Sequence, residues 1–80
     1  MKALSAKTLP LNLLNEGESA TVAEIRGGSC FRKKMADMGI VPNASISVVS
    51  GNAMSPKVVR IGETRVMLGL GILHKIMVTF

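Results

Sequence analysis

Clusters of turn-forming residues divide this chain into short segments, and this division constrains the fold more than any other feature. The clusters read NEGES, GGS, VPNA, SGNAMSP, IGET and LGLG, and between them lie the β-branched runs ATVAEI, SISVVS, KVVRI, TRVML and KIMVTF. Several short strands at such spacing are typical of a small all-β barrel or sandwich. The 80 residues leave room for one hydrophobic core, so we expect a single domain over residues 1–80.

Residues 57–68 predict a β-hairpin in a definite register. Gly62 stands first in a two-residue Gly-Glu loop, where a type II′ turn needs a positive φ. This loop length pairs Ile61 with Thr64, Arg60 with Arg65, and Val59 with Val66. Alternation then places on the inner face Val59, Ile61, Val66 and Leu68. The two arginines form a like-charged pair on the outer face, which either splays into solvent or receives an anionic group.

The last run, KIMVTF, shows the same alternation. It directs one set of side chains inward, namely Ile76, Val78 and Phe80. It directs the other set outward, namely Lys75, Met77 and Thr79. We therefore expect a strand with one face in the core and one face in solvent.

Residues 30–38 predict one short helix inserted among the strands. Phe31, Met35 and Met38 recur at the spacing of a single helical face, which we expect to contact the core. Ser29 precedes this stretch and is expected to cap its N-terminus by accepting a backbone hydrogen bond.

The end of this helix is also marked in the sequence. Gly39 is expected at the position just after the helix, where a positive φ costs glycine little. Pro42 and Asn43 then predict a turn, because proline fixes φ at the second position and asparagine tolerates the left-handed conformation at the third.

Arg32, Lys33 and Lys34 make this helix the most cationic stretch of a chain whose net charge is +5. Cations near the N-terminal end of a helix dipole are slightly unfavourable, so local stability does not account for them. One interpretation is a solvated face that keeps an apolar domain soluble. The other is docking to an acidic partner, which could be nucleic acid, anionic lipid or an acidic protein face.

The chain is unusually apolar, with 48% hydrophobic residues. A domain of this size hides only about 60–65% of its unfolded surface, so apolar side chains are expected on the surface, where they mark interaction sites. No run of about 18 apolar residues predicts a membrane span, and residues 1–17 lack the apolar stretch of a secretory signal. The single cysteine, Cys30, excludes an internal disulfide, fits a reducing cytoplasm and is expected to be buried.

Residues that carry catalysis or bind metals are scarce. The one histidine, His74, lies far in sequence from Cys30, and no nucleophile stands at a recognisable spacing from a base. A zinc site needs four ligands in closely spaced pairs, and no glycine-rich phosphate loop occurs. We therefore predict no catalytic residue, metal ligand or cofactor. Nucleic acid is not expected as a partner, because the chain has no Trp, no Tyr and only 2 Phe for stacking bases.

The stretch TLPLNLLNEGESATVAEIRGGSCFRKKMADMGIVPNASISVV resembles the FeoA family of bacterial ferrous-iron-transport accessory proteins. The signature D-M-G-I-x-P is met by residues 37–42, and the Gly62 hairpin follows in the family's order. The resemblance implies a mainly β, SH3-like barrel with one short α-helix inserted at about residues 30–38. It also implies a non-enzymatic cytoplasmic protein whose partner is FeoB, a membrane Fe(II) transporter with a G-protein domain. The sequence departs from the family pattern at Asn43, Gly69 and His74.

Together these observations predict a non-enzymatic accessory protein of Fe(II) uptake that binds the cytoplasmic part of a FeoB-type transporter through apolar and basic surface. The expected contacts are Leu11, Leu13, Leu14, Arg32, Lys33 and Lys34. Two alternatives are an SH3-like module that contacts a metal-responsive repressor and a basic small barrel that binds RNA or phosphate. Exposed apolar surface would also permit weak self-association.

Overall fold

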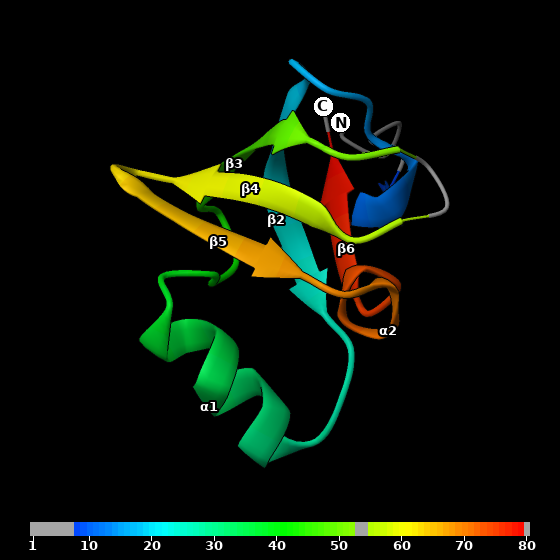
Figure 1. The fold of residues 1–80 in the computed structure, drawn as a ribbon. Coiled ribbons are helices and arrows are strands. Elements are labelled where there is room, and N and C mark those ends of the chain that lie inside the picture. Colours follow the sequence, from blue (N-terminus) through cyan, green and yellow to red (C-terminus); the bar gives the residue numbers. More distant parts are fainter. Residues whose placement is uncertain (1–7, 53–54, 80) are drawn as a thin grey trace, which may run out of the picture.

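The structure, a computed structural model, describes residues 8–52 and 55–79. Its elements are, in order, β1 (Thr8–Pro10), the 3-10 helix η2 (Leu11–Leu13), β2 (Ser19–Ile25), α1 (Ser29–Asp37), β3 (Ser45–Ser50), β4 (Lys57–Ile61), β5 (Thr64–Leu68), α2 (Leu70–Leu73) and β6 (Ile76–Thr79) (Figure 1). Phe80, expected to point inward, and residues 1–7 of the stretch considered as a secretory signal lie outside the described residues. Within the described ranges, no helix has both the length and the apolarity needed to cross a membrane.

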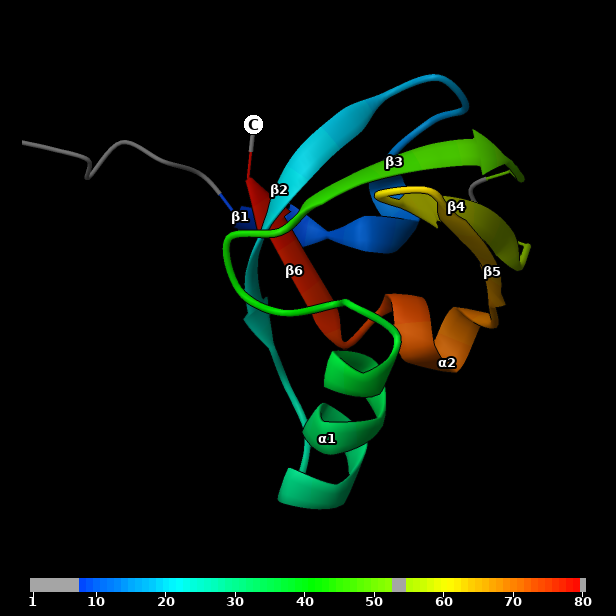
Figure 2. The same cartoon turned by 90° about the vertical axis from the view of Figure 1, so that its left-hand side faces the viewer.

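All six strands form one antiparallel sheet in the order β1-β6-β2-β3-β4-β5. Figure 2 shows how strongly this sheet curls, so that β2 and β6 face β4 and β5 across the interior. The two α-helices, α1 and α2, lie toward one end of the curled sheet, and α1 extends farthest from it (Figures 1 and 2). The predicted architecture, mainly β with a helix inserted between two strands, is confirmed.

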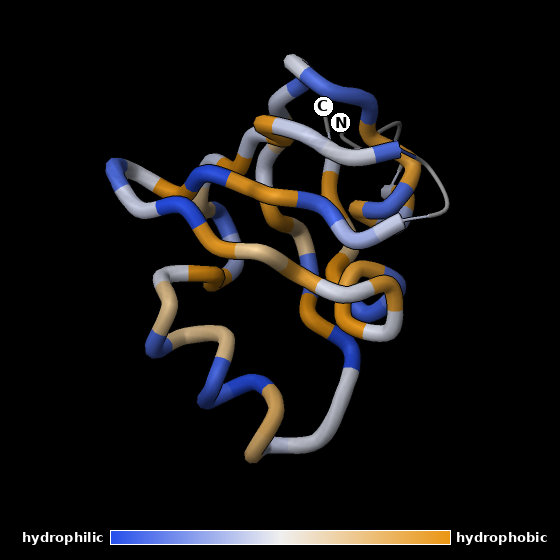
Figure 3. The backbone as a smooth tube through the Cα atoms, in the orientation of Figure 1, coloured by the Kyte–Doolittle hydropathy of each residue, from blue (hydrophilic) through white to orange (hydrophobic). Residues whose placement is uncertain are grey.

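The core fills the space that the curled sheet encloses. In Figure 3 hydrophobic colours follow the strands and α2, whereas α1 carries strongly hydrophilic stretches. The core side chains come from most of the elements: Leu11, Leu14, Ala20, Val22, Ile25, Met35, Ile40, Ile46, Val48, Val59, Leu68, Leu73, Ile76 and Val78. Two leucines expected at a partner surface, Leu11 and Leu14, are among them, so neither side chain is available for a surface contact. The reason is tertiary, because η2 packs against α2 and β6.

The β4–β5 hairpin has the predicted register throughout. Ile61 pairs with Thr64, Arg60 with Arg65, and Val59 with Val66. Gly62 has φ 61°, as the first position of a II′ loop requires. In β6 the prediction holds for Ile76 and Val78, which are fully buried, but it is wrong for Met77. Met77 is 7% exposed because β6 lies inside the sheet, where Pro10 and Glu24 flank it from both sides.

The ends of α1 differ in how well they satisfy the backbone. At the C-terminus Gly39 has φ 89°, and the N–H groups of Gly39 and Ile40 donate to the carbonyl oxygens of Ala36 and Met35, both at 2.9 Å. This is a Schellman motif, and its apolar contact joins buried Ile40 and Met35. At the N-terminus the cap is Gly28, with no side-chain hydrogen bond, so the expected cap at Ser29 is wrong. Ser29 is already inside the first helical turn.

The turn predicted within LGLG is partly helical. The N–H groups of Ile72 and Leu73 both donate to the carbonyl oxygen of Gly69 at 3.0 Å, which opens α2. Four residues are too few to show helical periodicity, and so short a helix is stable only when it packs on a core. Leu73 supplies that packing, because its side chain is fully buried.

Candidate partner-binding groove

A hollow on the described surface lies between α1, the C-terminal part of β2 and the turn that follows α1. It has a volume of about 500 Å³ and is lined by Ala23, Glu24, Ile25, Ser29, Arg32, Lys33, Ala36, Ile40, Val41 and Pro42. We call it the α1–β2 groove. Six of these ten residues are apolar, and two cations stand among the others.

The spacing of residues along α1 explains which side chains reach the groove. Phe31, Met35 and Met38 form the predicted core face, with Met35 buried and the other two half-buried against the core. A second stripe consists of Ser29, Arg32, Lys33 and Ala36, all of which line the groove. The remaining stripe, Cys30, Lys34 and Asp37, is exposed and does not line it. The basic triplet is therefore divided between two faces of the helix.

An irregularity in β2 shapes the opposite wall. Val22 pairs with Val78 and Glu24 with Met77, so Ala23 is an extra residue in a β-bulge. A bulge bends its strand and re-aims neighbouring side chains. Ala23 and the residues after it, Glu24 and Ile25, line the groove. The bulge thus turns the end of β2 toward α1.

The turn after α1 closes the groove at its third side. The N–H of Ala44 donates to the carbonyl oxygen of Val41 at 3.0 Å, and Asn43 has φ 76°. Proline at the second position and a positive φ at the third define a type II turn, as predicted. The N–H of Asn43 also donates to the carbonyl oxygen of Val22 at 2.7 Å, which fixes the turn against β2. Val41 is consequently held at the surface, where 39% of the residue is exposed.

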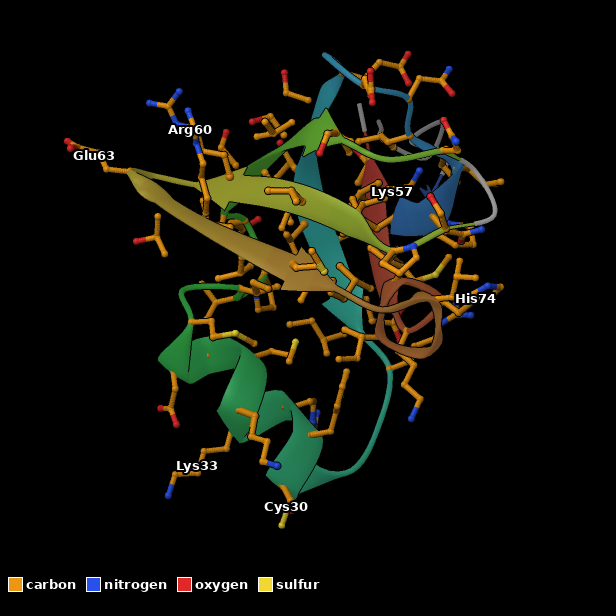
Figure 4. All side chains as sticks on the ribbon, in the orientation of Figure 1. Cys30, Lys33, Lys57, Arg60, Glu63 and His74 are labelled. Carbon is orange, nitrogen blue, oxygen red and sulfur yellow. The ribbon has the colours of Figure 1, made fainter. Side chains whose placement is uncertain are left out.

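The charges around the groove are predominantly positive. Glu24 is the one acid that lines it, and its Oε2 lies 3.6 Å from Nε of Arg26. Arg32 and Lys33 form no ion pair among the described residues. Figure 4 shows Lys33 extending from α1 into solvent. In the first turn of α1, the ring centroid of Phe31 lies 5.0 Å from Nζ of Lys75. This cation–π contact links α1 to the residue that directly precedes β6.

The structure gathers only part of the predicted contact set. Arg32 and Lys33 meet at the groove, whereas Lys34 points to another side of α1. Leu13 is 54% exposed but belongs to η2 and does not line the groove. The predicted contact residues did not include Ala36 and Val41, although both line the groove. The spacing of residues 29, 32, 33 and 36 could have indicated Ala36, and a valine directly before the turn proline could have indicated Val41.

Cys30 and His74 lie on different elements and do not approach each other. Figure 4 shows Cys30 at the far end of α1 and His74 beside α2. Cys30 is exposed, so its expected burial is wrong, because it belongs to the helical stripe that faces away from the core. Across residues 8–52 and 55–79, no three His, Cys, Asp or Glu side chains are close enough to hold a metal ion.

Comparison with models of protein families assigns the chain to a family. The FeoA domain model matches residues 9–79, which is nearly the whole sequence. The chain belongs to the FeoA family. Among curated proteins, none matches the sequence.

Solved structures agree with this assignment. An iron uptake regulatory protein (FeoA) is 32% identical, with a TM-score of 0.84, and the match covers 91% of this chain and 97% of that one. FeoA of Stenotrophomonas maltophilia, solved with zinc and described as a prokaryotic SH3 domain protein, is 20% identical with a TM-score of 0.76 and 88% of each chain covered. The predicted SH3-like fold is therefore confirmed.

The same fold occurs in a different kind of protein. A manganese-dependent transcriptional repressor is 22% identical with a TM-score of 0.82, and the match covers 92% of this FeoA chain but 42% of the repressor. At this level of identity the likeness shows the fold alone. Family membership is the more specific finding, and it supports an accessory role in iron transport for this FeoA protein.

Proposed function

We propose that this FeoA protein acts in the cytoplasm, where it binds the cytoplasmic region of a FeoB-type Fe(II) transporter through the α1–β2 groove. The observation that carries the proposal is the composition of the groove. Its floor is apolar, with Ile25, Ala36, Ile40 and Val41, and its rim carries Arg32 and Lys33, two cations that form no ion pair with any described residue. An apolar centre with a polar rim that includes arginine is the usual anatomy of a protein–protein contact.

The aromatic residues favour a protein over a nucleic acid in this groove. Stacking of bases requires exposed aromatic rings. Phe31 is half-buried, and its ring is already covered by Lys75. Phosphate contacts by Arg32 and Lys33 alone would leave the apolar floor without a partner. A segment that carries both apolar and acidic side chains satisfies floor and rim together.

Adjacent lysines on α1 offer a matched test. Lys33 lines the groove and Lys34 does not, yet both are exposed and differ by one position. We expect Lys33→Glu to weaken co-purification with the transporter at least about tenfold, because it places a carboxylate against acidic partner groups. Lys34→Glu makes the same change in net charge and should weaken binding only about twofold at physiological salt, where distant charges are screened.

Two results would contradict the proposal. Equal effects of the two reversals would show that net charge, and not the groove, controls binding. Capture of a metal-responsive repressor in place of the transporter would favour the alternative function.

Uptake measurements in cells test the biological role. Cells that lack this gene should show altered Fe(II) uptake, and the wild-type gene should restore it. Ala36→Leu should fail to restore uptake, because it fills the groove while leucine keeps a high helix propensity. A circular dichroism spectrum equal to that of the wild type would show that the variant is folded. Full complementation by such a folded variant would exclude the groove.

A further inference from the structure

A row of polar side chains crosses four strands on the outer face of the sheet, away from the α1–β2 groove. Ser19 of β2 pairs with Ser47 of β3, Ser47 pairs with Arg60 of β4, and Arg60 pairs with Arg65 of β5. Directly opposed residues share one face of a sheet. With strands about 4.8 Å apart, the row is about 14 Å long and ends in two guanidinium groups.

A hollow lies over Ser19, Ser47 and Arg60 of this row, and Arg65, the cross-strand neighbour of Arg60, stands beyond its lining. Its volume is about 320 Å³, and it is lined by Ser19, Ser45, Ile46, Ser47, Arg60 and Gly62. A second hollow of about 270 Å³ adjoins it and shares Ser19 and Ser45. Neither hollow shares a residue with the α1–β2 groove. The polar groups that line the first hollow are three hydroxyls and one guanidinium.

Arg60 is held in place but keeps hydrogen-bonding capacity. Its Nε donates to the carbonyl oxygen of Gly62 at 3.0 Å, which fixes the guanidinium over the hairpin loop. Within the described part of the chain, no acid pairs with Arg60 or Arg65, and the hydroxyls of Ser19, Ser45 and Ser47 form no hydrogen bond. The other N–H groups of the two guanidinium groups and the three hydroxyls are therefore available to donate hydrogen bonds to a ligand.

The neighbouring acids do not neutralise these arginines. Glu18 directly precedes Ser19, but its Oε1 accepts from the N–H of Asn15 at 2.7 Å. Glu63 lies in the hairpin loop, and Figure 4 shows it extending from the tip in a direction different from Arg60. Two like charges directly opposite each other on a sheet are unfavourable, and an anion bound between them would relieve the repulsion.

We propose that this surface, which we call the Arg60–Arg65 site, binds a phosphate group. A phosphate oxyanion accepts several hydrogen bonds at once, and planar guanidinium groups match its geometry by offering two parallel donors. The serine hydroxyls supply further donors along the row. A carboxylate has fewer acceptor oxygens and would leave some of these hydroxyls unpaired. The site is independent of transporter binding and can be tested on the isolated protein.

The test is an NMR titration of the folded, ¹⁵N-labelled full chain at constant ionic strength. The probes are inorganic phosphate, adenosine triphosphate, and vesicles that contain phosphatidylglycerol. We expect saturable shifts of the Ser19, Ser47, Arg60 and Arg65 amides. Arg65→Gln should weaken binding about tenfold, because a hydrogen bond to a charged group is lost. Lys34→Gln removes one positive charge from the distant helix and should leave the affinity within about twofold.

The probes also distinguish the source of the phosphate. Binding of the soluble phosphates without vesicle binding identifies a free phosphate ligand, and the reverse identifies a lipid headgroup. Either result supports the site. Equal weakening by Arg65→Gln and Lys34→Gln, shifts spread over all basic residues, or no saturable binding of any probe would overturn it. Arg65 makes no internal hydrogen bond or ion pair among the described residues, so its replacement should not unfold the chain.

Discussion

At the scale of single residues, Asn43 and Lys57 occupy environments that most residue types avoid. Asn43 has φ 76° in a turn position where glycine is unstrained. Lys57 is 1% exposed, and its alternation with Val59 in β4 directs it inward. Its Nζ donates to the carbonyl oxygen of Asn52 at 2.7 Å, so the ammonium group holds the loop between β3 and β4. Substitutions at the two positions should therefore change the stability of the protein for different reasons.

Asn43 tests the cost of a left-handed backbone in the turn that borders the groove. Asn43→Ala should lower the free energy of unfolding by about 1–2 kcal/mol, because alanine pays the full steric cost of positive φ. Asn43→Gly should change it by less than about 0.5 kcal/mol, since relief of strain is offset by the greater chain entropy of the unfolded state. Urea denaturation of the three proteins measures both differences. Equal stability of the alanine and glycine variants would show that the turn relaxes to a negative φ.

Lys57 separates packing from charge. Lys57→Met keeps a long apolar stem and removes the buried ammonium, so we expect stability unchanged or increased by about 1 kcal/mol. Lys57→Ala also removes the stem and should cost about 2–4 kcal/mol. Thermal and urea unfolding provide the comparison. If the methionine variant were as unstable as the alanine variant, the hydrogen bond to Asn52, and not the packing, would be the main contribution.

At the scale of elements, α1 carries a well-satisfied C-terminus and a poorly satisfied N-terminus. Its first turn has no acidic residue, and its cap, Gly28, offers no side-chain acceptor. Basic residues follow at once, against the helix dipole. The helix is held instead by its apolar face and by the contact between Lys75 and Phe31. The cations of α1 therefore lower its local stability slightly, and two of them, Arg32 and Lys33, line the α1–β2 groove.

Improving the cap should stabilise α1 directly. Gly28 has φ −74° and ψ 172°, and a Cβ added there would meet no atom within 4 Å. Gly28→Asp supplies both a capping oxygen and a negative charge, and Gly28→Ala supplies neither. We expect the aspartate variant to be more stable than the alanine variant by about 1–2 kcal/mol. Differential scanning calorimetry should then separate their melting temperatures by about 4–16 °C. Equal melting temperatures would mean that α1 does not unfold with the rest of the domain.

Local patterns predicted these elements well because their causes are local. A two-residue loop at Gly62 sets the whole β4–β5 register, and Gly39 with Pro42 sets the end of α1 and the next turn. Exposure of Cys30 was missed although residues 30, 34 and 37 are spaced as a separate helical stripe. The burial of Leu11 could not be predicted this way, because it depends on the packing of η2 against β6 and α2, which lie far along the chain.

The groove was predictable only in part, for the same reason. The sequence marks Arg32 and Lys33 as candidates, but it does not show that the wall facing them is the end of β2. That wall depends on the bulge at Ala23, which exists only because β2 pairs with β6 in a shifted register. Pairing of strands so distant in sequence leaves no local signal.

At the scale of the whole molecule, charge is distributed unequally between the two ends. The turn at residues 15–18 lies at the end of the molecule opposite α1 (Figure 1). Its acids are engaged locally, because Oε2 of Glu16 accepts from the N–H of Gly51 at 2.9 Å and Oε1 of Glu18 accepts from the N–H of Asn15. The cations of α1 have no such partners among the described residues. Electrostatic attraction would therefore orient this protein so that α1 faces an approaching acidic partner.

The segment that leads into β2 contributes side chains to the core of the molecule. β1 pairs with β6, and the leucines that follow β1 alternate between core and solvent. Leu14 is 1% exposed, whereas its neighbour Leu13 is 54% exposed. The two leucines can therefore separate the contribution of this segment to folding from any contribution to binding.

Leu14→Ala should lower the free energy of unfolding by about 2–4 kcal/mol, because it leaves a cavity in a small core. Small domains have little stability in reserve, so part of this variant should be unfolded at 37 °C. Leu13→Ala should change stability by less than about 0.5 kcal/mol and should leave transporter binding intact, because Leu13 lies outside the α1–β2 groove. Urea denaturation and co-purification of both variants test this division. A Leu13→Ala protein that is fully stable yet no longer binds the transporter would move the contact surface from the groove to η2.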